Sequence, residues 1–388
     1  MKIGSSTIVK LTSLRFVFLA IAFVLLWVIS SNSLFFRSKL NDIVDRVFPK
    51  LGIYEQTSLT EFSEIDEYIK DMVGGITNSQ KFPIIDIKVK QKNVLILNSD
   101  LKNEGRSFVP ATFSVYEAGR INELKGKIRT KGDRSLHKES FTNMSFRVNL
   151  EGDDRLFGIE EFSVQDPILR GYSWELLVAD ILKSQGLLTL KNVVADFSFN
   201  GESRGLRVFE EVPSTVTLER NLKKSGPIFG LNEDYGPGLD SVLDVYDAKD
   251  WEGTTIYNSA REKLLMQFTT AREGGVFSKE IFDLDEWARY FALIDLFGTY
   301  HGSVPKSVRF YFNPVIGKFQ PLLFDAHKGA GRFSEYIIAD HKMNPKSVEC
   351  EWTCDQREFY NGFLNNKYFF DAYLEYLVKY SSIEFVQN

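Results

Sequence analysis

Hydrophobic and polar residues divide the chain into segments of different periodicity, and the first of these is an uninterrupted apolar run. Residues 16–36 contain no charged side chain, and a helix of about 20 residues spans a hydrocarbon core of about 30 Å. The run predicts an uncleaved transmembrane helix; the alternative is a signal peptide cut near Ser31, Asn32 and Ser33. Basic residues lie on both sides of the run, so the positive-inside rule does not decide the orientation. We expect a short tail inside and the large following domain outside, which is a single-pass, inner-membrane arrangement.

Apolar residues recur at helical spacing after this run, and a period of two then takes over. Residues 37–80 are predicted to form a helical juxtamembrane stalk. The alternation next predicts strands at residues 84–89, 94–97, 108–116, 125–130 and 146–150. In the last of these, Arg147 lies on the face opposite Phe146 and Val148.

A helix and a hairpin complete this β-rich part of the chain. The apolar stripe over residues 173–185 predicts a helix that ends at Gly186. Alternating runs at residues 192–199 and 205–209 flank Asn200 and Gly201. Asn-Gly between two such runs is the strongest short signal for a β-hairpin.

Helical patterns dominate the remainder of the chain. Helices are predicted at residues 215–221, 250–270 and 284–298, and a hairpin at residues 308–312 and 319–324. The pattern as a whole predicts an α+β protein with four parts. These are a tail and transmembrane anchor at 1–36, the stalk at 37–80, a β-rich first lobe at 81–212 and a mainly helical second lobe at 213–388.

Composition narrows the class of protein. The 388 residues are 44% hydrophobic and 26% charged, as in globular proteins. A net charge of −5 excludes a chain-wide basic footprint for nucleic acid. The two cysteines, Cys350 and Cys354, are too few for a disulfide scaffold, although they could pair with each other outside the cytoplasm.

The first predicted lobe carries a cluster of basic side chains next to a glycine. Its members are Arg129, Lys131, Gly132, Asp133, Arg134, His137, Lys138 and Arg147. A glycine beside cationic side chains lets backbone N–H groups approach a phosphate, so one interpretation is an anion site. The other interpretation is a solvated basic face. The glycine spacing matches neither a Walker loop nor GxGxxG.

Acidic residues mark three further positions. Glu175 lies in the first turn of its predicted helix. Its negative charge would interact favourably with the helix dipole there, or it would orient a nearby cationic side chain. Glu210 and Glu211 end the second strand of the Asn-Gly hairpin. Asp325 follows an apolar strand and precedes a glycine-rich loop, which suits either a Mg²⁺ ligand or a turn-capping residue.

Two histidines near Asp325 in the sequence raise the possibility of zinc binding. His301 precedes the second hairpin, and His327 lies two residues after Asp325. The three side chains could bind zinc, but no spacing motif supports such a site. A serine hydrolase is disfavoured because the chain contains no GxSxG element.

A series of segments between residues 125 and 331 adds a resemblance. They read KGKIRTKGDRSLH, SFRVNL, LFGIEEFSVQDPILRGYSWE, FSFNGESRGLRVFEEV, TLERNLKKSGPIF, WARYFALIDLFGTYHGS, VRFYFNP and GKFQPLLFDAHKG. In this order they resemble the spore coat protein H (CotH) kinase family, a set of atypical, secreted or surface protein kinases. The resemblance is closest to the branch found in bacterial envelope and polysaccharide gene settings.

The resemblance implies a two-lobed kinase-like fold that binds ATP with Mg²⁺ or Mn²⁺ and phosphorylates Ser or Thr hydroxyls. By position, it assigns phosphate or cofactor contacts to Lys131, Gly132, Lys138, Arg147, Glu175, Glu210 and Glu211. Asp325 matches the first carboxylate of the family's metal motif.

Several positions depart from the family pattern. His327 stands where the second metal carboxylate is expected, and Ser307 where a metal-binding Asn is expected. His301 replaces the Asp that would orient the acceptor hydroxyl. A neutral imidazole can act as a base near pH 7, so the catalytic pair would be His301 and Asp325.

Two principal functions follow from the resemblance. The first is a membrane-anchored CotH-like phosphotransferase acting on an envelope protein. The second is a pseudokinase that serves as a binding or scaffold module in surface-polysaccharide or coat assembly. A third hypothesis is a glycan-active enzyme that uses Glu210 and Asp325 as paired carboxylates.

Overall fold

The computed structural model describes residues 82–103, 105–117, 120–131, 144–170, 174–232, 242–326, 338 and 357–387. They belong to one compact unit, Lys81–Asn388, which is distinct from Met1–Gln80. The predicted transmembrane run at residues 16–36, the predicted stalk, and Cys350 and Cys354 lie outside the described residues.

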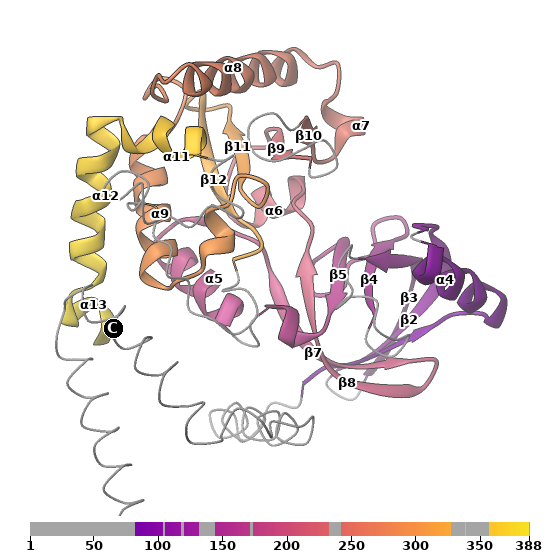
Figure 1. Ribbon diagram of the computed structural model, residues 1–388. Coiled ribbons are helices and arrows are strands. Elements are labelled where there is room, and N and C mark those ends of the chain that lie inside the picture. Colours follow the sequence, from indigo (N-terminus) through magenta and orange to yellow (C-terminus); the bar gives the residue numbers. More distant parts are fainter. Residues whose placement is uncertain are drawn as a thin grey trace, which may run out of the picture. The chain divides into compact units, whose positions relative to one another are not determined.

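Seven strands close into a barrel in the order β1-β2-β3-β4-β5-β8-β7 (Figure 1). They are β1 (Ile84–Lys88), β2 (Val109–Glu117), β3 (Arg120–Lys131), β4 (Ser145–Leu150), β5 (Glu161–Gln165), β7 (Asn192–Phe199) and β8 (Glu202–Glu211). Neighbouring strands are antiparallel except for β1 and β7, which pair in parallel. This parallel pairing joins the first strand of the barrel to a hairpin more than 100 residues later in the chain.

Alternation along the strands fills the barrel with apolar side chains. Phe146 and Val148 of β4 lie in this core, and Arg147 between them points to the other face. Phe146 stacks on Phe199 with ring centroids 5.5 Å apart, and Phe113 meets Phe162 edge-on at 6.5 Å.

The strand predicted at residues 94–97 is wrong, because this segment belongs to helix α4 (Gln91–Asn103), which contacts β2 and β3. Val94 and Leu97 are buried in the barrel core, whereas Leu95 and Ile96 are exposed. Burial at a spacing of three residues is the pattern of a helix face. A short apolar run cannot by itself distinguish a helix from a strand.

The Asn-Gly turn between β7 and β8 also fastens β1. Asn200 and Gly201 have φ values of 53° and 78°, as a two-residue type I′ hairpin requires. The Asn200 side chain accepts a hydrogen bond from the Val89 N–H at 2.7 Å and donates to the Val89 carbonyl at 3.1 Å. The Asp86 carboxylate accepts from the Gly201 N–H at 2.9 Å. One turn therefore both reverses the chain and holds the two strands that close the barrel.

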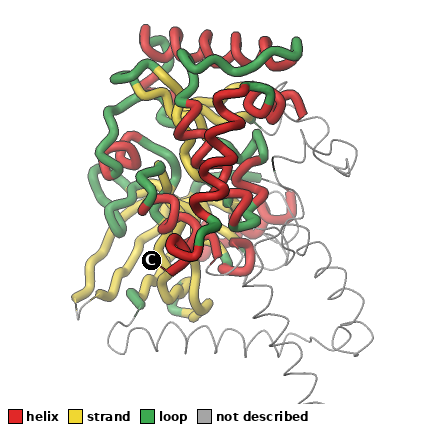
Figure 2. The backbone as a smooth tube through the Cα atoms, turned by 90° about the vertical axis from the view of Figure 1, so that its left-hand side faces the viewer, coloured by secondary structure: helices red, strands yellow, loops and turns green. Residues whose placement is uncertain are grey.

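A five-stranded sheet in the order β10-β9-β11-β12-β6 forms the centre of the remaining elements. Its strands are β6 (Leu188–Thr189), β9 (Ile228–Leu231), β10 (Leu243–Val245), β11 (Arg309–Asn313) and β12 (Lys318–Leu323). The helices are η3 (Pro167–Arg170), α5 (Trp174–Ser184), α6 (Thr215–Arg220), α7 (Ala248–Trp251), α8 (Thr255–Arg272), α9 (Leu284–Leu296), η6 (Tyr300–Ser303), α11 (Arg357–Leu364), α12 (Lys367–Tyr380) and α13 (Ile383–Gln387). Helices α9 and α12 pack side by side (Figure 1), and Figure 2 shows the helices in red and the strands in yellow.

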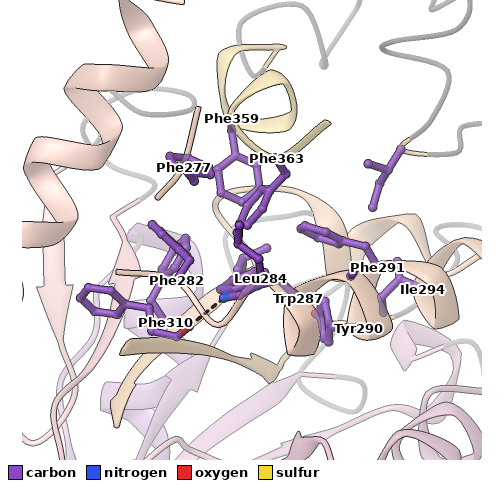
Figure 3. Packing of buried hydrophobic residues seen from close by; sticks show 14 of the residues in the cluster. Phe277, Phe282, Leu284, Trp287, Tyr290, Phe291, Ile294, Phe310, Phe359 and Phe363 are labelled. Carbon is purple, nitrogen blue, oxygen red and sulfur yellow. Dashed lines mark hydrogen bonds between the residues drawn. The ribbon is translucent and has the colours of Figure 1, made fainter. Parts of the chain in front are cut away.

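Aromatic side chains supply a large part of the core around α9. Figure 3 shows Phe359 and Phe363 pointing from α11 toward the side chains of α9. The ring of Trp287 lies 5.0 Å from that of Phe363 and 5.4 Å from that of Phe310. The Trp287 indole N–H donates to the Phe319 carbonyl at 3.0 Å, so this buried polar atom is satisfied.

These elements differ from the predicted two-lobed kinase-like fold, which is therefore wrong; the transmembrane helix predicted to precede it lies outside the described residues. The β-rich part closes on itself as a barrel, and the following part is a mixed α/β arrangement with its own sheet. Helix α5, predicted to belong to the first lobe, joins the core around α9. Residues 188–189, placed in the same lobe, form strand β6, which pairs in parallel with β12. Adjacent elements in the sequence gave no indication of these long-range pairings.

One finding stands against the expected single-pass, inner-membrane location, although the apolar run at residues 16–36 itself lies outside the described residues. Within the described ranges, no helix is long and apolar enough to cross a membrane. The longest described helix, α8, has 18 residues, and its charged residues include Arg261, Glu262 and Lys263.

Substitution of Asn200 tests how the barrel is closed. We expect Asn200→Ala to lower the free energy of unfolding by about 2–3 kcal/mol, since two hydrogen bonds are lost and a left-handed φ is imposed on alanine. Asn200→Gly removes the same bonds without the backbone strain, so its loss should be about 1 kcal/mol smaller. Urea unfolding of both variants measures the difference. An alanine variant as stable as the wild type would show that the Asn200–Val89 bonds do not hold the barrel closed.

Candidate functional site

A row of polar residues crosses four strands of the barrel on the face opposite its apolar core. Arg129 of β3 is paired with Arg147 of β4, which is paired with Ser163 of β5, which is paired with Glu210 of β8. Ser163 and Glu210 are 1% and 2% exposed, and Gln165, on the same face of β5, is fully buried. Polar side chains are seldom buried without bonding partners, so this face is a candidate site.

Ionic and amide contacts connect this row, and we call Lys131, Arg147, Glu161, Gln165 and Glu210 the barrel-face cluster. Lys131 Nζ lies 3.2 Å from Glu210 Oε2, and Gln165 Nε2 donates to the same oxygen at 2.6 Å. Arg147 Nη1 lies 3.4 Å from Glu161 Oε1. Burial raises the pKa of Glu161, and the charge of Arg147 opposes this rise.

A buried donor and a buried acceptor of the barrel-face cluster have no hydrogen bond within the described residues. Arg147 Nε, a donor, and Gln165 Oε1, an acceptor, are both buried and have no partner within the described part of the chain. An unmade hydrogen bond at a buried polar atom costs about 1–3 kcal/mol. Arg147 Nε and Gln165 Oε1 can thus offer a donor and an acceptor to a ligand.

Glu211 has a different role from Glu210, although sequence analysis assigned both to the cofactor. Arg220 of α6 forms a bidentate ion pair with the Glu211 carboxylate, and the Lys191 N–H donates to Glu211 Oε2 at 2.8 Å. Because successive residues of a strand face opposite sides, Glu211 points away from the barrel-face cluster. Its contacts join β8 to α6 and to the segment before β7.

A second group of predicted residues meets after β12, and we call Glu175, His301, Ser307 and Asp325 the Asp325 cluster. Asp325 has a φ of 56°, which is uncommon for a residue other than glycine and is often found at functional sites. The Ser307 hydroxyl donates to Asp325 Oδ2 at 3.2 Å, and His301 Nδ1 lies 3.8 Å from the same oxygen. The side chains of His301 and Asp325 are 18% and 20% exposed, so both are partly accessible to solvent.

Local structure fixes the members of the Asp325 cluster. Helix α9 ends before Gly298, and the short helix η6 then carries His301. The Tyr290 hydroxyl of α9 donates to the Gly302 carbonyl at 2.6 Å, which holds η6 against α9. Glu175, expected to orient a cation, accepts a hydrogen bond from the Ala326 N–H at 3.2 Å and so positions the backbone beside Asp325.

The donor set near Asp325 can be compared with the requirements of the expected metal. Mg²⁺ is commonly held by one or two carboxylates together with waters and substrate phosphates. Asp325 and Ser307 provide one carboxylate and one hydroxyl oxygen, which fits such a site. Within the described ranges, no group of three or more His, Cys, Asp or Glu side chains is placed to hold a metal ion. His327, Gly132 and Lys138 lie outside these ranges.

Comparison with protein-family models finds no match, and comparison with curated proteins finds none either. The resemblance to the CotH family therefore stays a prediction. The geometry of the two clusters carries the functional argument below.

Sequence analysis missed a buried polar network at the start of α9. Glu286 is 5% exposed and accepts a hydrogen bond from Gln320 of β12. Lys223 Nζ lies 4.0 Å from Glu286 Oε1, and Gln320 also bonds to Asp283 and Asn313. Burial raises the pKa of Glu286 to about 7, although the charge of Lys223 opposes the rise. Glu286 lies in the first turn of α9, and its position in the sequence does not reveal its burial.

The raised pKa of Glu286 makes stability depend on pH. The unfolded chain loses this proton near pH 4.5 and the folded chain near pH 7, so the carboxyl costs stability as pH rises through this interval. Glu286→Gln should unfold like the wild type below about pH 4.5 and be more stable by about 3 kcal/mol well above pH 7. Chemical denaturation across this pH range measures the difference. The exposed Glu375→Gln of α12 is the control, and a pH-independent difference for Glu286→Gln would contradict the assignment.

Proposed function

We propose that this protein transfers a phosphoryl group from a nucleotide to a Ser or Thr hydroxyl, and that the Asp325 cluster performs the chemistry. The observation that carries the proposal is the position of one carboxylate oxygen, Asp325 Oδ2, next to both the His301 imidazole and the Ser307 hydroxyl. A carboxylate beside an imidazole is an arrangement that makes histidine an effective base toward a hydroxyl.

His301 takes the proton of the acceptor hydroxyl in the proposed reaction. As that oxygen bonds to phosphorus, the bond from phosphorus to the nucleotide oxygen breaks, and the proton passes to His301 Nε2. The Asp325 carboxylate, 3.8 Å from Nδ1 and so beyond hydrogen-bond length, stabilises the imidazolium through its charge. A bound Mg²⁺ or Mn²⁺ would supply charge neutralisation at the phosphates, with Asp325 as its protein carboxylate.

The barrel-face cluster supports the nucleotide part of the proposal. Lys131 and Arg147 carry positive charge, and Arg147 Nε is a buried donor without a partner in the described residues. Arginine is well suited to phosphate oxygens because its donors are planar and always charged. We assign part of the donor's phosphate chain to this face, and Ser or Thr side chains of an envelope protein to the acceptor role.

The pairing of charges favours a second candidate function, a noncatalytic binding module in surface-polysaccharide or coat assembly. Glu210 pairs with Lys131, and Ser307 already donates to Asp325. Internal partners of this kind lower the attraction that a ligand would feel. A module that binds a nucleotide without turning it over fits these contacts.

Phosphate transfer by the full chain, measured with labelled ATP and Mg²⁺ or Mn²⁺, tests the proposal. His301→Gln should lower the rate about 10²- to 10⁴-fold, the usual contribution of a general base. Asp325→Asn should lower it comparably because the imidazolium loses its stabilising charge. Asp371→Asn, which changes an exposed carboxylate on α12, is the matched control and should leave the rate unchanged.

Three outcomes of this experiment separate the candidates. Label incorporation that depends on both His301 and Asp325 supports phosphoryl transfer. A nucleotide-dependent rise in melting temperature without incorporation supports the binding module. Incorporation that survives both substitutions would refute the catalytic assignment.

A further inference from the structure

Arg309 of β11 is a buried cation that sequence analysis did not single out. The residue is 6% exposed, and within the described part of the chain no carboxylate lies within ion-pairing distance of its guanidinium. Burying a charge is costly unless it is paired and hydrogen-bonded. The groups around Arg309 therefore indicate how its charge is stabilised and which of its donor nitrogens can bind a ligand.

Neutral groups hold the guanidinium on three sides. Arg309 Nε donates to the Tyr246 hydroxyl at 2.6 Å, and Nη1 donates to the carbonyls of Lys306 and Val308 at 2.8 and 3.1 Å. Its Cζ lies 4.0 Å from the centroid of the Phe324 ring, within cation–π range. These contacts fix the orientation of the guanidinium but contribute no negative charge.

Gly230 of β9 allows the Arg309 side chain to lie flat across the sheet. Gly230 and Arg309 are directly paired between β9 and β11. A Cβ at position 230 would lie 3.3 Å from both Cδ and Nε of Arg309. The absence of a side chain at Gly230 therefore leaves room for the guanidinium between the strand and the aromatic rings.

Nη2 is the donor nitrogen of Arg309 that remains available. Nε and Nη1 are engaged as described, whereas Nη2 makes no hydrogen bond within the described ranges. A preorganised guanidinium with a donor nitrogen left over, and with no counter-ion among the described residues, has the chemistry of an oxyanion site.

Arg309 also borders the Asp325 cluster. Phe324, which stacks on the guanidinium, directly precedes Asp325, and Ser307, which donates to Asp325, lies two residues before Arg309. The same short segments of chain thus position the carboxylate, the hydroxyl and the cation.

We propose that Arg309 binds a phosphate group of the ligand through Nη2 beside the Asp325 cluster, and that a phosphate ester is therefore the ligand class of this site. The inference deepens the proposed function and rests on it for the reaction, but phosphate binding can be measured without turnover. Arg309 provides the positive charge that attracts the anionic ligand, a charge that the Asp325 carboxylate and a neutral His301 do not provide. The Tyr246 hydroxyl positions the Arg309 guanidinium.

Titration of the full chain with inorganic phosphate tests the role of Arg309. The dissociation constant is measured by calorimetry and by the rise in melting temperature, against chloride at matched ionic strength. Arg309→Met should weaken phosphate binding about 10- to 100-fold, the range expected for a lost charged hydrogen bond. Arg309→Lys retains the charge but not the planar donors and should give an intermediate loss; it decides the question if Arg309→Met does not fold. Tyr246→Phe should weaken binding less than Arg309→Met, because the charge remains while its orientation relaxes.

Arg289 of α9 provides the matched control. This arginine also donates to a backbone carbonyl and packs over a tyrosine ring, that of Tyr376. Arg289→Met should leave phosphate binding unchanged. Wild-type affinity in both Arg309 variants, or no phosphate binding by the wild type, would overturn the inference.

The same variants distinguish failure of this inference from failure of the proposed function. Arg309-dependent phosphate binding without transfer from ATP would retain the anion site and refute the transferase. Transfer from ATP that is independent of Arg309 would retain the transferase and refute the anion site. Adenosine, which has no phosphate, should bind wild type and Arg309→Met alike.

Discussion

The parallel pairing of β1 with β7 is the constraint on which the barrel depends. Without it the seven strands would form an open sheet with two unpaired edges, and edge strands invite pairing with other chains. Asn200 meets this constraint through its side chain, because the groups of Val89 that it bonds lie immediately after β1. A local turn signal in the sequence therefore has a long-range consequence in the fold.

Closure also determines where charge can be placed. Once one face of every strand points into an apolar core, the polar residues of β3, β4, β5 and β8 must lie on the other face. Glu210 is nonetheless buried there, and a buried ion pair recovers little more than its desolvation cost. Stability alone therefore explains poorly why Lys131, Gln165 and Glu210 form a buried polar network. A binding role for these residues is consistent with their burial.

Helix α9 has the corresponding importance for the Asp325 cluster. Its aromatic face is fixed by Trp287 and its partners, and its last turn determines where η6 presents His301. Asp295, buried in this last turn, accepts hydrogen bonds from the Ile338 N–H and from the Tyr373 hydroxyl of α12. The packing of α9 is therefore coupled to the position of the candidate base through a few short contacts.

Sequence patterns predicted the elements with local signals and failed where pairing is long-range. The Asn-Gly hairpin and helix α9 were predicted because their turn residues and periodicity are contained in the segment itself. Strands β6 and β9 were missed because they are short and pair with strands far along the chain. The candidate site follows the same rule. His301, Ser307 and Asp325 were predicted from the sequence and do lie together. Arg309 was not, because its burial cannot be read from a single sequence.

The state of each buried charge finally distinguishes residues that hold the fold from those that await a ligand. Glu211 has a bidentate arginine and a backbone donor, and its contacts explain its burial completely. Arg309 has hydroxyl, carbonyl and aromatic neighbours that orient it but leave its charge uncompensated in the described residues. Since an uncompensated buried charge costs several kcal/mol, an anion bound beside Asp325 is the simplest compensation that this chemistry allows.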